Sequence, residues 1–70
     1  MKKYNYYKVI QSKHAQTWDD ESFYTCNSRG VMDKTERELL NHDLKEYRLA
    51  YHGAPVRVIF RRELIQQTGV

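Results

Sequence analysis

The sequence is poor in cysteine and glycine, with one cysteine and three glycines among 70 residues. The lone Cys26 excludes an intrachain disulfide and lacks the partner ligands of a structural zinc site. The glycines are isolated from one another, so the chain has neither a phosphate-binding loop nor a G-x-S-x-G nucleophile elbow. No apolar run approaches the roughly 20 residues of a membrane helix, and no signal-peptide segment is present. We therefore expect a soluble, cytoplasmic protein without a cofactor or a metal.

The chain nevertheless has the composition of a folded protein. Hydrophobic residues make up 40% of it and aromatic residues 13%, whereas disordered segments are poor in both. Its length limits it to one small domain spanning residues 1–70. A core of this size rarely supplies more than about 3–5 kcal/mol of stability, so marginal stability or a binding partner is expected.

Residues 33–51 have the pattern of an amphipathic helix. Apolar side chains recur on one face at helical spacing: Leu40, Leu44, Tyr47 and Tyr51. Asp33 is placed as the N-cap, with Glu36 three residues later, and Gly53 is placed to end the helix. Asp43 lies within the apolar stripe, where a carboxylate needs either a partner such as a tyrosine hydroxyl or a raised pKa.

Three segments favour β-strands. Residues 56–62 alternate between an apolar and a basic side, and residues 4–11 and 22–26 are rich in aromatic and β-branched residues. Residues 18–21 and 27–30 have turn chemistry and bound the second strand. The order strand, strand, helix, strand predicts an α+β protein, with a three-stranded antiparallel sheet of order 2-1-3 and the helix packed on one face.

Basic residues gather in the two segments that the predicted sheet brings together. Residues 1–14 hold four lysines and no acid, a charge of +4, and residues 53–70 carry a charge of +2. We expect the sheet face away from the helix to present tyrosine, lysine and arginine side chains, which stack on bases and hold phosphates in single-stranded nucleic acid. The predicted nucleic-acid interface on these strands consists of Tyr4, Tyr6, Lys8, Arg57, Arg61 and Arg62.

The register of the first strand decides this interface. If the strand slips by one residue, Tyr4 and Tyr6 are buried, and Tyr7 and Val9 become exposed instead. A purely structural interpretation also accounts for the composition, because tyrosine favours strands and pairs with lysine and arginine across a solvated face. Nucleic-acid binding is the leading functional hypothesis.

Enzymatic activity is not predicted. Cys26 and the three histidines, His14, His42 and His52, have the chemistry of nucleophiles or metal ligands, but no two of them stand at the ligand-pair spacing of two to four residues. No predicted element brings a nucleophile, a base and an orienting group together. We therefore predict a non-catalytic binding protein.

A protein partner is the alternative to nucleic acid. Trp18, a residue type enriched in binding hot spots, and Leu49, an apolar residue on the polar side of the helix, are candidate contacts. In its size and lack of motifs the chain resembles the accessory proteins of phages and mobile elements, which act as inhibitors or adaptors on host proteins. The second and third strands lie at the sheet edges, so we expect a monomer or a weak dimer through a strand edge.

Overall fold

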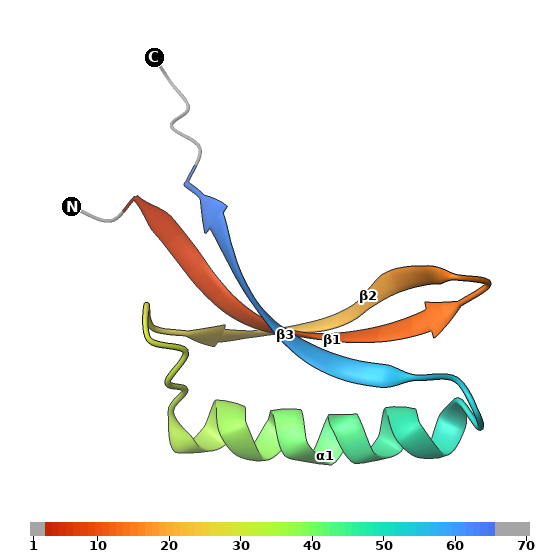
Figure 1. Ribbon diagram of the computed structural model, residues 1–70. Helices are drawn as coiled ribbons and strands as arrows, with labels where there is room; N and C mark the ends of the chain where they lie inside the picture. The colour runs from red at the N-terminus through yellow and green to blue at the C-terminus, as the bar shows by residue number, and fades with distance from the viewer. Residues whose placement is uncertain (1–2, 66–70) are drawn as a thin grey trace.

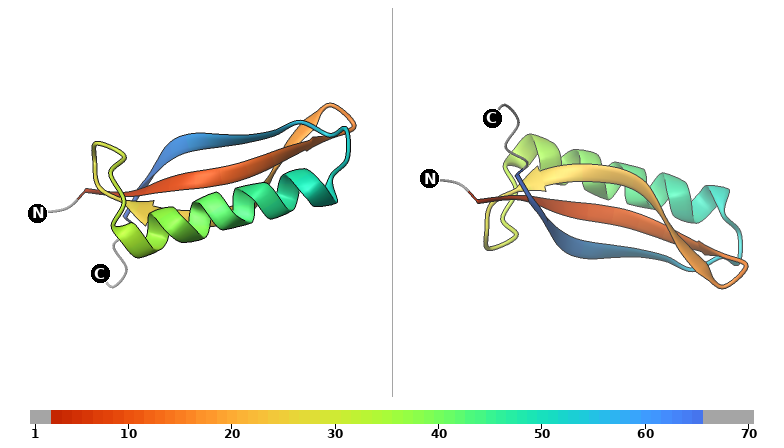
Figure 2. Two further views of the ribbon diagram at one scale, coloured as in Figure 1. Left: turned by 90° about the horizontal axis from the view of Figure 1, so that it is seen from below. Right: turned by 90° about the horizontal axis from the view of Figure 1, so that it is seen from above.

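The computed structural model describes residues 3–65 as three strands and one helix (Figure 1). In chain order these are β1 (Tyr4–His14), β2 (Thr17–Cys26), α1 (Lys34–Ala50) and β3 (Val56–Leu64). The strands form an antiparallel sheet of order β2-β1-β3, and α1 lies along one face of it (Figure 1 and Figure 2). The predicted α+β architecture is therefore confirmed. Within residues 3–65, no helix is long and apolar enough to cross a membrane.

The β1–β2 hairpin is longer than the sequence suggests. Residues 18–21 lie within β2, and the chain reverses at Ala15 and Gln16, whose φ angles are 50° and 71°. Two consecutive positive φ angles fit the type I′ turns of hairpins, although asparagine and glycine are the usual residues there. The predicted turn at residues 18–21 is wrong because its acidic side chains find partners across the sheet. Asp20 Oδ1, for example, accepts a hydrogen bond from Gln11 Nε2 at 2.7 Å.

Both ends of α1 follow the predicted capping. Asp33 is the N-cap, and its Oδ1 accepts a hydrogen bond from the Glu36 backbone N–H at 2.9 Å. The Glu36 carboxylate bonds to Thr25 of β2, accepting from its N–H at 3.0 Å and from its hydroxyl at 3.2 Å, so it ties the start of the helix to the sheet. Beyond the other end, Gly53 has a φ of 78°, a left-handed conformation that suits glycine.

A small core fills the space between α1 and the sheet. Ile10, Tyr24 and Leu40 are buried at its centre. Five partly buried side chains pack around them: Met32, Leu44, Tyr47, Val56 and Val58. Tyr24 donates its hydroxyl hydrogen to Asp43 Oδ2 at 2.7 Å, and burial together with this bond raises the pKa of Tyr24 to about 12. The same bond, helped by His42, holds the pKa of Asp43 below its usual value, so a tyrosine partner explains the carboxylate in the apolar stripe.

The sheet extends beyond the helix at one end. By ideal geometry the 17 residues of α1 span about 26 Å, whereas the 11 residues of β1 span about 36 Å. β2 ends at Cys26, opposite Tyr6, so residues 4–5 of β1 pair with β3 alone. Figure 1 shows the N-terminal end of β1 and the C-terminal end of β3 bending away from α1 together. We call this projecting pair, residues 4–8 and 60–64, the arm.

Candidate nucleic-acid interface

Cross-strand pairing determines which side chains share a face of the sheet. Residues directly opposite each other in an antiparallel pair point to the same side. Ile10 pairs with Val58, and both belong to the core under α1. Because side chains alternate along a strand, Tyr4, Tyr6 and Lys8 lie on this helix-side face as well.

The prediction of one outer face with both tyrosines and arginines is therefore wrong. Arg57 and Arg61 lie on the outer face beside Tyr7 and Val9, whereas the two predicted tyrosines share the helix side with Arg62. The sequence leaves this register open because each side of the first strand carries apolar residues. The faces are those of the one-residue slip, but the burial differs from it. Tyr4, Tyr6 and Tyr7 are all half-buried, and Val9 is fully buried.

On the arm, the helix-side face carries a row of three aromatic rings. The ring centroids of Tyr4 and Tyr6 are 6.3 Å apart, and Tyr6 stacks with Phe60 at 5.9 Å with ring planes 10° apart. Arg62 lies over one end of the row, with its Cζ 4.3 Å from the Tyr4 centroid. Lys8 lies over the other end, with its Nζ 5.5 Å from the Phe60 centroid. We call these five residues the aromatic–cation patch.

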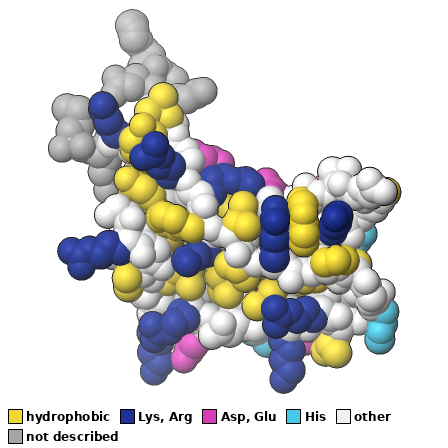
Figure 3. Space-filling view, in the orientation of Figure 1, with side chains coloured by type: hydrophobic (Ala, Val, Ile, Leu, Met, Phe, Trp, Pro, Cys, Tyr) yellow, Lys and Arg dark blue, Asp and Glu magenta, His cyan; other side chains and the backbone are white. Residues whose placement is uncertain are grey.

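The two cations of the patch form no salt bridge with the carboxylates of the described residues. Residues 3–65 form three salt bridges, and none of them involves Lys8 or Arg62. Gly30 leaves space for Lys8, because a Cβ at this left-handed position (φ 79°) would lie 3.3 Å from Lys8 Nζ. In Figure 3, hydrophobic and basic side chains lie together along the arm at the upper left. Within residues 3–65, no salt bridge thus neutralises the positive charge of the patch.

Phe60 is the patch residue that was not predicted. The alternation of β3 correctly places it on the helix side with Val56 and Val58, where burial was expected. Phe60 is instead 47% exposed, because the arm bends away from α1. No local pattern in the sequence points to this exposure, because it depends on how the sheet bends relative to α1.

A hollow of about 820 Å³ opens beside the patch, between the arm and the loop that joins β2 to α1. Tyr4 and Tyr6 line it from the arm, and Asn27 lines it from the loop. Asn27 Oδ1 accepts hydrogen bonds from the backbone N–H groups of Arg29 and Val31 at 2.8 and 2.9 Å, which holds the loop in a turn. The hollow therefore has one wall of aromatic rings and one wall of hydrogen-bonded loop.

The outer face of the sheet carries similar side chains, but they bind one another. Arg57 lies over Trp18, with its Cζ 3.9 Å from the ring centroid, and its Nε donates to Gln11 Oε1 at 2.9 Å. Gln11 Nε2 donates in turn to Asp20, as described above. Both terminal nitrogens of Arg61 donate to Asp20, at 2.7 and 3.1 Å. We call this series of five side chains, which crosses all three strands, the outer ladder.

The outer ladder neutralises part of its own charge. The hydrogen bonds from Arg61 and Gln11 hold the pKa of the Asp20 carboxyl below its usual value. Asp20 in turn raises the pKa of Arg61, which also lies 5.8 Å from the Phe23 ring centroid. Val9 is 0% exposed on this face, although α1 covers only the other face (Figure 2). The predicted contacts Arg57 and Arg61 thus already hold intramolecular partners.

Trp18 and Leu49, the candidate protein contacts, lie on opposite sides of the sheet. Trp18 belongs to the outer face, half-buried beside Arg57 and within 5.8 Å of Lys13 Nζ. Leu49 is 59% exposed on α1, beside a depression that Leu44 also lines. The two residues therefore do not form one binding surface.

Two side chains with nucleophilic chemistry, Cys26 and Ser12, lie outside the aromatic–cation patch. Burial raises the pKa of the Cys26 thiol, and nearby Lys8 opposes this shift only in part. Ser12 Oγ lies 2.7 Å from His14 Nε2 and donates to Glu21, so the serine hydroxyl stands between the histidine and the acid. A hydrolytic triad instead has the histidine in the middle, where it accepts the serine proton. Ser12 is also 0% exposed.

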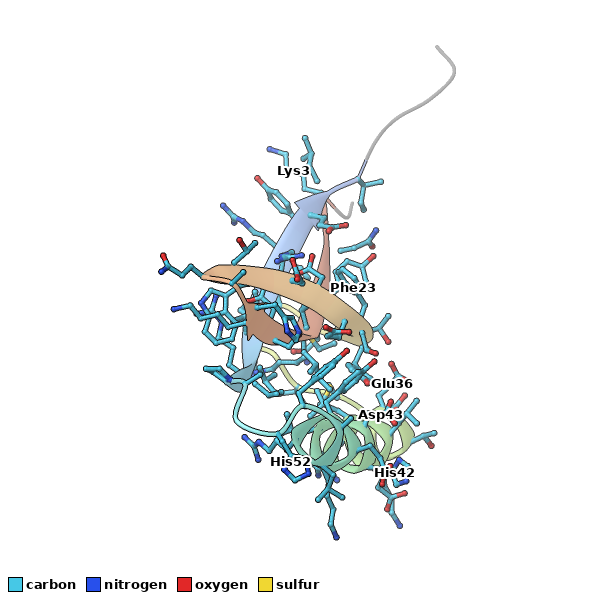
Figure 4. The ribbon with its side chains drawn as sticks, turned by 90° about the vertical axis from the view of Figure 1, so that its right-hand side faces the viewer. Lys3, Phe23, Glu36, His42, Asp43 and His52 are labelled. Carbon is cyan, nitrogen blue, oxygen red and sulfur yellow. The ribbon has the colours of Figure 1, made fainter. Side chains whose placement is uncertain are left out.

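The remaining histidines do not join the patch. Figure 4 shows His42 and His52 near α1, at the far end of the molecule from Lys3, which stands at the end of the arm. In the part of the chain that the structure describes, no group of histidine, cysteine and acidic residues is arranged to hold a metal ion.

No protein-family model, curated protein or solved structure matches this chain. Side-chain geometry and charge are therefore the basis for a functional conclusion.

Proposed function

We propose that this protein is a non-catalytic binding protein whose aromatic–cation patch holds single-stranded nucleic acid. The observation that carries the proposal is the row of Tyr4, Tyr6 and Phe60 with a cation at each end. Neither cation forms a salt bridge within residues 3–65. Aromatic rings are stacking platforms for any base, and lysine and arginine hold the phosphates that connect the bases. The outer face is the weaker candidate, because Asp20 and Gln11 already bind its arginines.

The contacts that the patch gains on binding are stronger than the cation–π contacts that it loses. An exposed cation–π contact contributes about 0.5–1 kcal/mol, whereas a base stacked on an aromatic ring contributes about 1–3 kcal/mol. Lys8 and Arg62 therefore lose little when they turn from the rings to phosphates. The hollow beside Tyr4 and Tyr6 leaves room for a base turned out of the row.

The same contacts favour a single-stranded ligand over a duplex. Rings stack on bases only when the bases are not already paired and stacked within a duplex. We expect a preference for single strands over duplex DNA of the same length. We also expect affinity to fall as salt rises, because bound cations release the counterions of the phosphates.

Arg61 and Arg62 give a matched pair of variants for testing the patch. They are neighbours in sequence, yet Arg61 pairs with Asp20 on the outer face and Arg62 lies over Tyr4 in the patch. We expect Arg62→Gln to weaken binding of a fluorescein-labelled oligothymidylate, measured by anisotropy between about 50 and 200 mM salt, and to lower the salt slope by about 0.7. Arg61→Gln removes the same formal charge and should leave both quantities nearly unchanged.

Two results would overturn the proposal. The first is an affinity no better than millimolar for single-stranded DNA and RNA at low salt. The second is an equal loss of affinity in Arg61→Gln and Arg62→Gln, which would show that net charge alone governs binding. Circular dichroism of both variants establishes that they keep the fold during the comparison.

A further inference from the structure

The outer edge of β3 has no neighbouring strand within residues 3–65. Its hydrogen-bonding groups can be assigned from the bonds at its two ends. Ile65 N–H donates to the Lys3 carbonyl at 3.0 Å, and the Pro55 carbonyl accepts from Lys13 N–H at 2.9 Å. Odd-numbered residues of this segment therefore turn their backbone groups toward β1. The even-numbered residues turn theirs outward.

The sequence of β3 is complementary to itself when it is read in the opposite direction. If Phe60 lies on a two-fold axis, Phe60 faces Phe60 of the second copy as a hydrogen-bonded pair. Arg57 then faces Glu63 of the second copy, and the symmetry repeats this ion pair. At the ends of the strand, Val56 faces Leu64. Ile59 and Val58 face Arg61 and Arg62, so no two like charges lie directly opposite each other.

Neighbouring registers lack this charge complementarity. An axis at Ile59 places Arg57 opposite Arg61 twice, and an axis at Arg61 places two copies of Arg61 opposite each other. Like charges directly opposite in a sheet are destabilising. The charge pattern therefore selects the register centred on Phe60.

The charged pair that this register requires is available. Arg57 uses its Nε for Gln11, and no hydrogen bond within residues 3–65 uses its two terminal nitrogens. Glu63 is exposed and takes part in none of the salt bridges of the described chain. Both side chains lie on the outer face. Arg57 and Glu63 of the second copy would form a non-hydrogen-bonded pair, the kind of pair in which opposite side chains come closest.

The β2 edge is protected against such pairing. It carries three consecutive acids, Asp19, Asp20 and Glu21, and the register of its pairing with β1 shifts between Ile10 and Gln11. Edge charges of one sign and irregularities of register both discourage the addition of a strand. Of the two edges, β3 is thus the one that suits a second copy.

We propose that two copies of this chain pair along β3, antiparallel and centred on Phe60, to form a six-stranded sheet. Residues opposite each other share a face, so the two aromatic–cation patches lie on the same side and meet at the Phe60 pair. The proposal does not depend on nucleic-acid binding, and its test uses the protein alone.

Sedimentation equilibrium of the full chain from about 1 µM to 1 mM tests the pairing. We expect a reversible dimer whose dissociation constant rises about tenfold or more in Glu63→Arg, which turns two attractive pairs into two repulsive ones. The double variant Arg57→Glu with Glu63→Arg exchanges the two charges and should restore much of the association. Glu38→Arg on the exposed face of α1 makes the same change of charge and should leave the constant unchanged.

Several outcomes would overturn the dimer. The proposal is wrong if the chain stays monomeric over the whole concentration range. It is also wrong if the Glu63→Arg variant associates as tightly as the unmodified chain. If Arg57→Glu with Glu63→Arg associates no better than Glu63→Arg while circular dichroism shows an intact fold, pairing in this register is wrong.

Discussion

The aromatic–cation patch and the outer ladder are built from the same kinds of residue on the two faces of one sheet. Each places arginine over an aromatic ring, at 4.3 Å for Arg62 and 3.9 Å for Arg57. The difference lies in one acid, because Asp20 and its partner Gln11 bind the arginines of the outer ladder. No carboxylate pairs with the cations of the patch within residues 3–65. Composition alone thus does not distinguish the two faces, whereas the pairing of each cation does.

The largest expected effect is a loss of affinity when aromatic rings are removed from the patch but not from the outer face. We expect Tyr6→Leu with Phe60→Leu to lower affinity for single-stranded oligonucleotides by about 30-fold or more, because two stacking platforms are lost. Phe23→Leu removes an aromatic ring of the outer side, which packs edge to face with Tyr7 at 5.8 Å and does not line the hollow beside the patch. This matched control should change affinity by less than about twofold. Equal losses in an anisotropy titration would mean that the faces do not differ in function.

The next effect concerns the stability that the outer ladder provides. Asp20→Ala removes the acceptor for Arg61 and for the buried amide of Gln11. We expect the free energy of unfolding to fall by about 1–2 kcal/mol, since a buried donor left without a partner is costly. Asp19→Ala, at the exposed neighbouring position, should change it by less than about 0.5 kcal/mol. Urea denaturation of both variants measures the difference, and a similar small effect in both would contradict the role of Asp20.

The smallest effect is a change in acid stability. The pKa of Asp20 lies below its ordinary value of 3.8 in the folded chain, so the unfolded chain binds a proton there more readily. Its stabilising contribution is therefore complete above pH 3.8 and is lost as the pH falls through the lowered value. Asp20→Asn should be less stable near neutral pH and should lose less stability on acidification. Urea denaturation at several pH values measures this loss. If both proteins lose the same free energy of unfolding between neutral pH and about pH 2, the assignment is wrong.

Much of the fold follows from local patterns in the sequence. The alternation of residues 56–60 and the stripe from Leu40 to Tyr51 each have one clearly apolar side, so the sheet order and the helix were predicted correctly. The turn was misplaced because Ala15 and Gln16 have no turn signal, whereas the acids at residues 18–21 do. Those acids are accommodated in a strand by cross-strand partners, which a local pattern does not reveal.

The candidate site was harder to predict than the fold. In β1, Tyr6 and Ile10 mark one apolar side and Tyr7 and Val9 mark another, so alternation does not choose between the two registers. The choice depends on which side α1 covers, and that is a property of the assembled molecule. The exposure of Phe60 likewise depends on where the strands bend away from the helix.

The burial of Val9 has a consequence for how this protein tolerates change. The outer ladder crosses the strands on the same face as Val9, so this face withdraws an apolar side chain from water without a second helix. Arg57 and Arg61 belong to this ladder, although their place on the surface resembles that of any basic strand residue. Engineering for charge or solubility is therefore better directed to the solvent side of α1 than to the outer ladder.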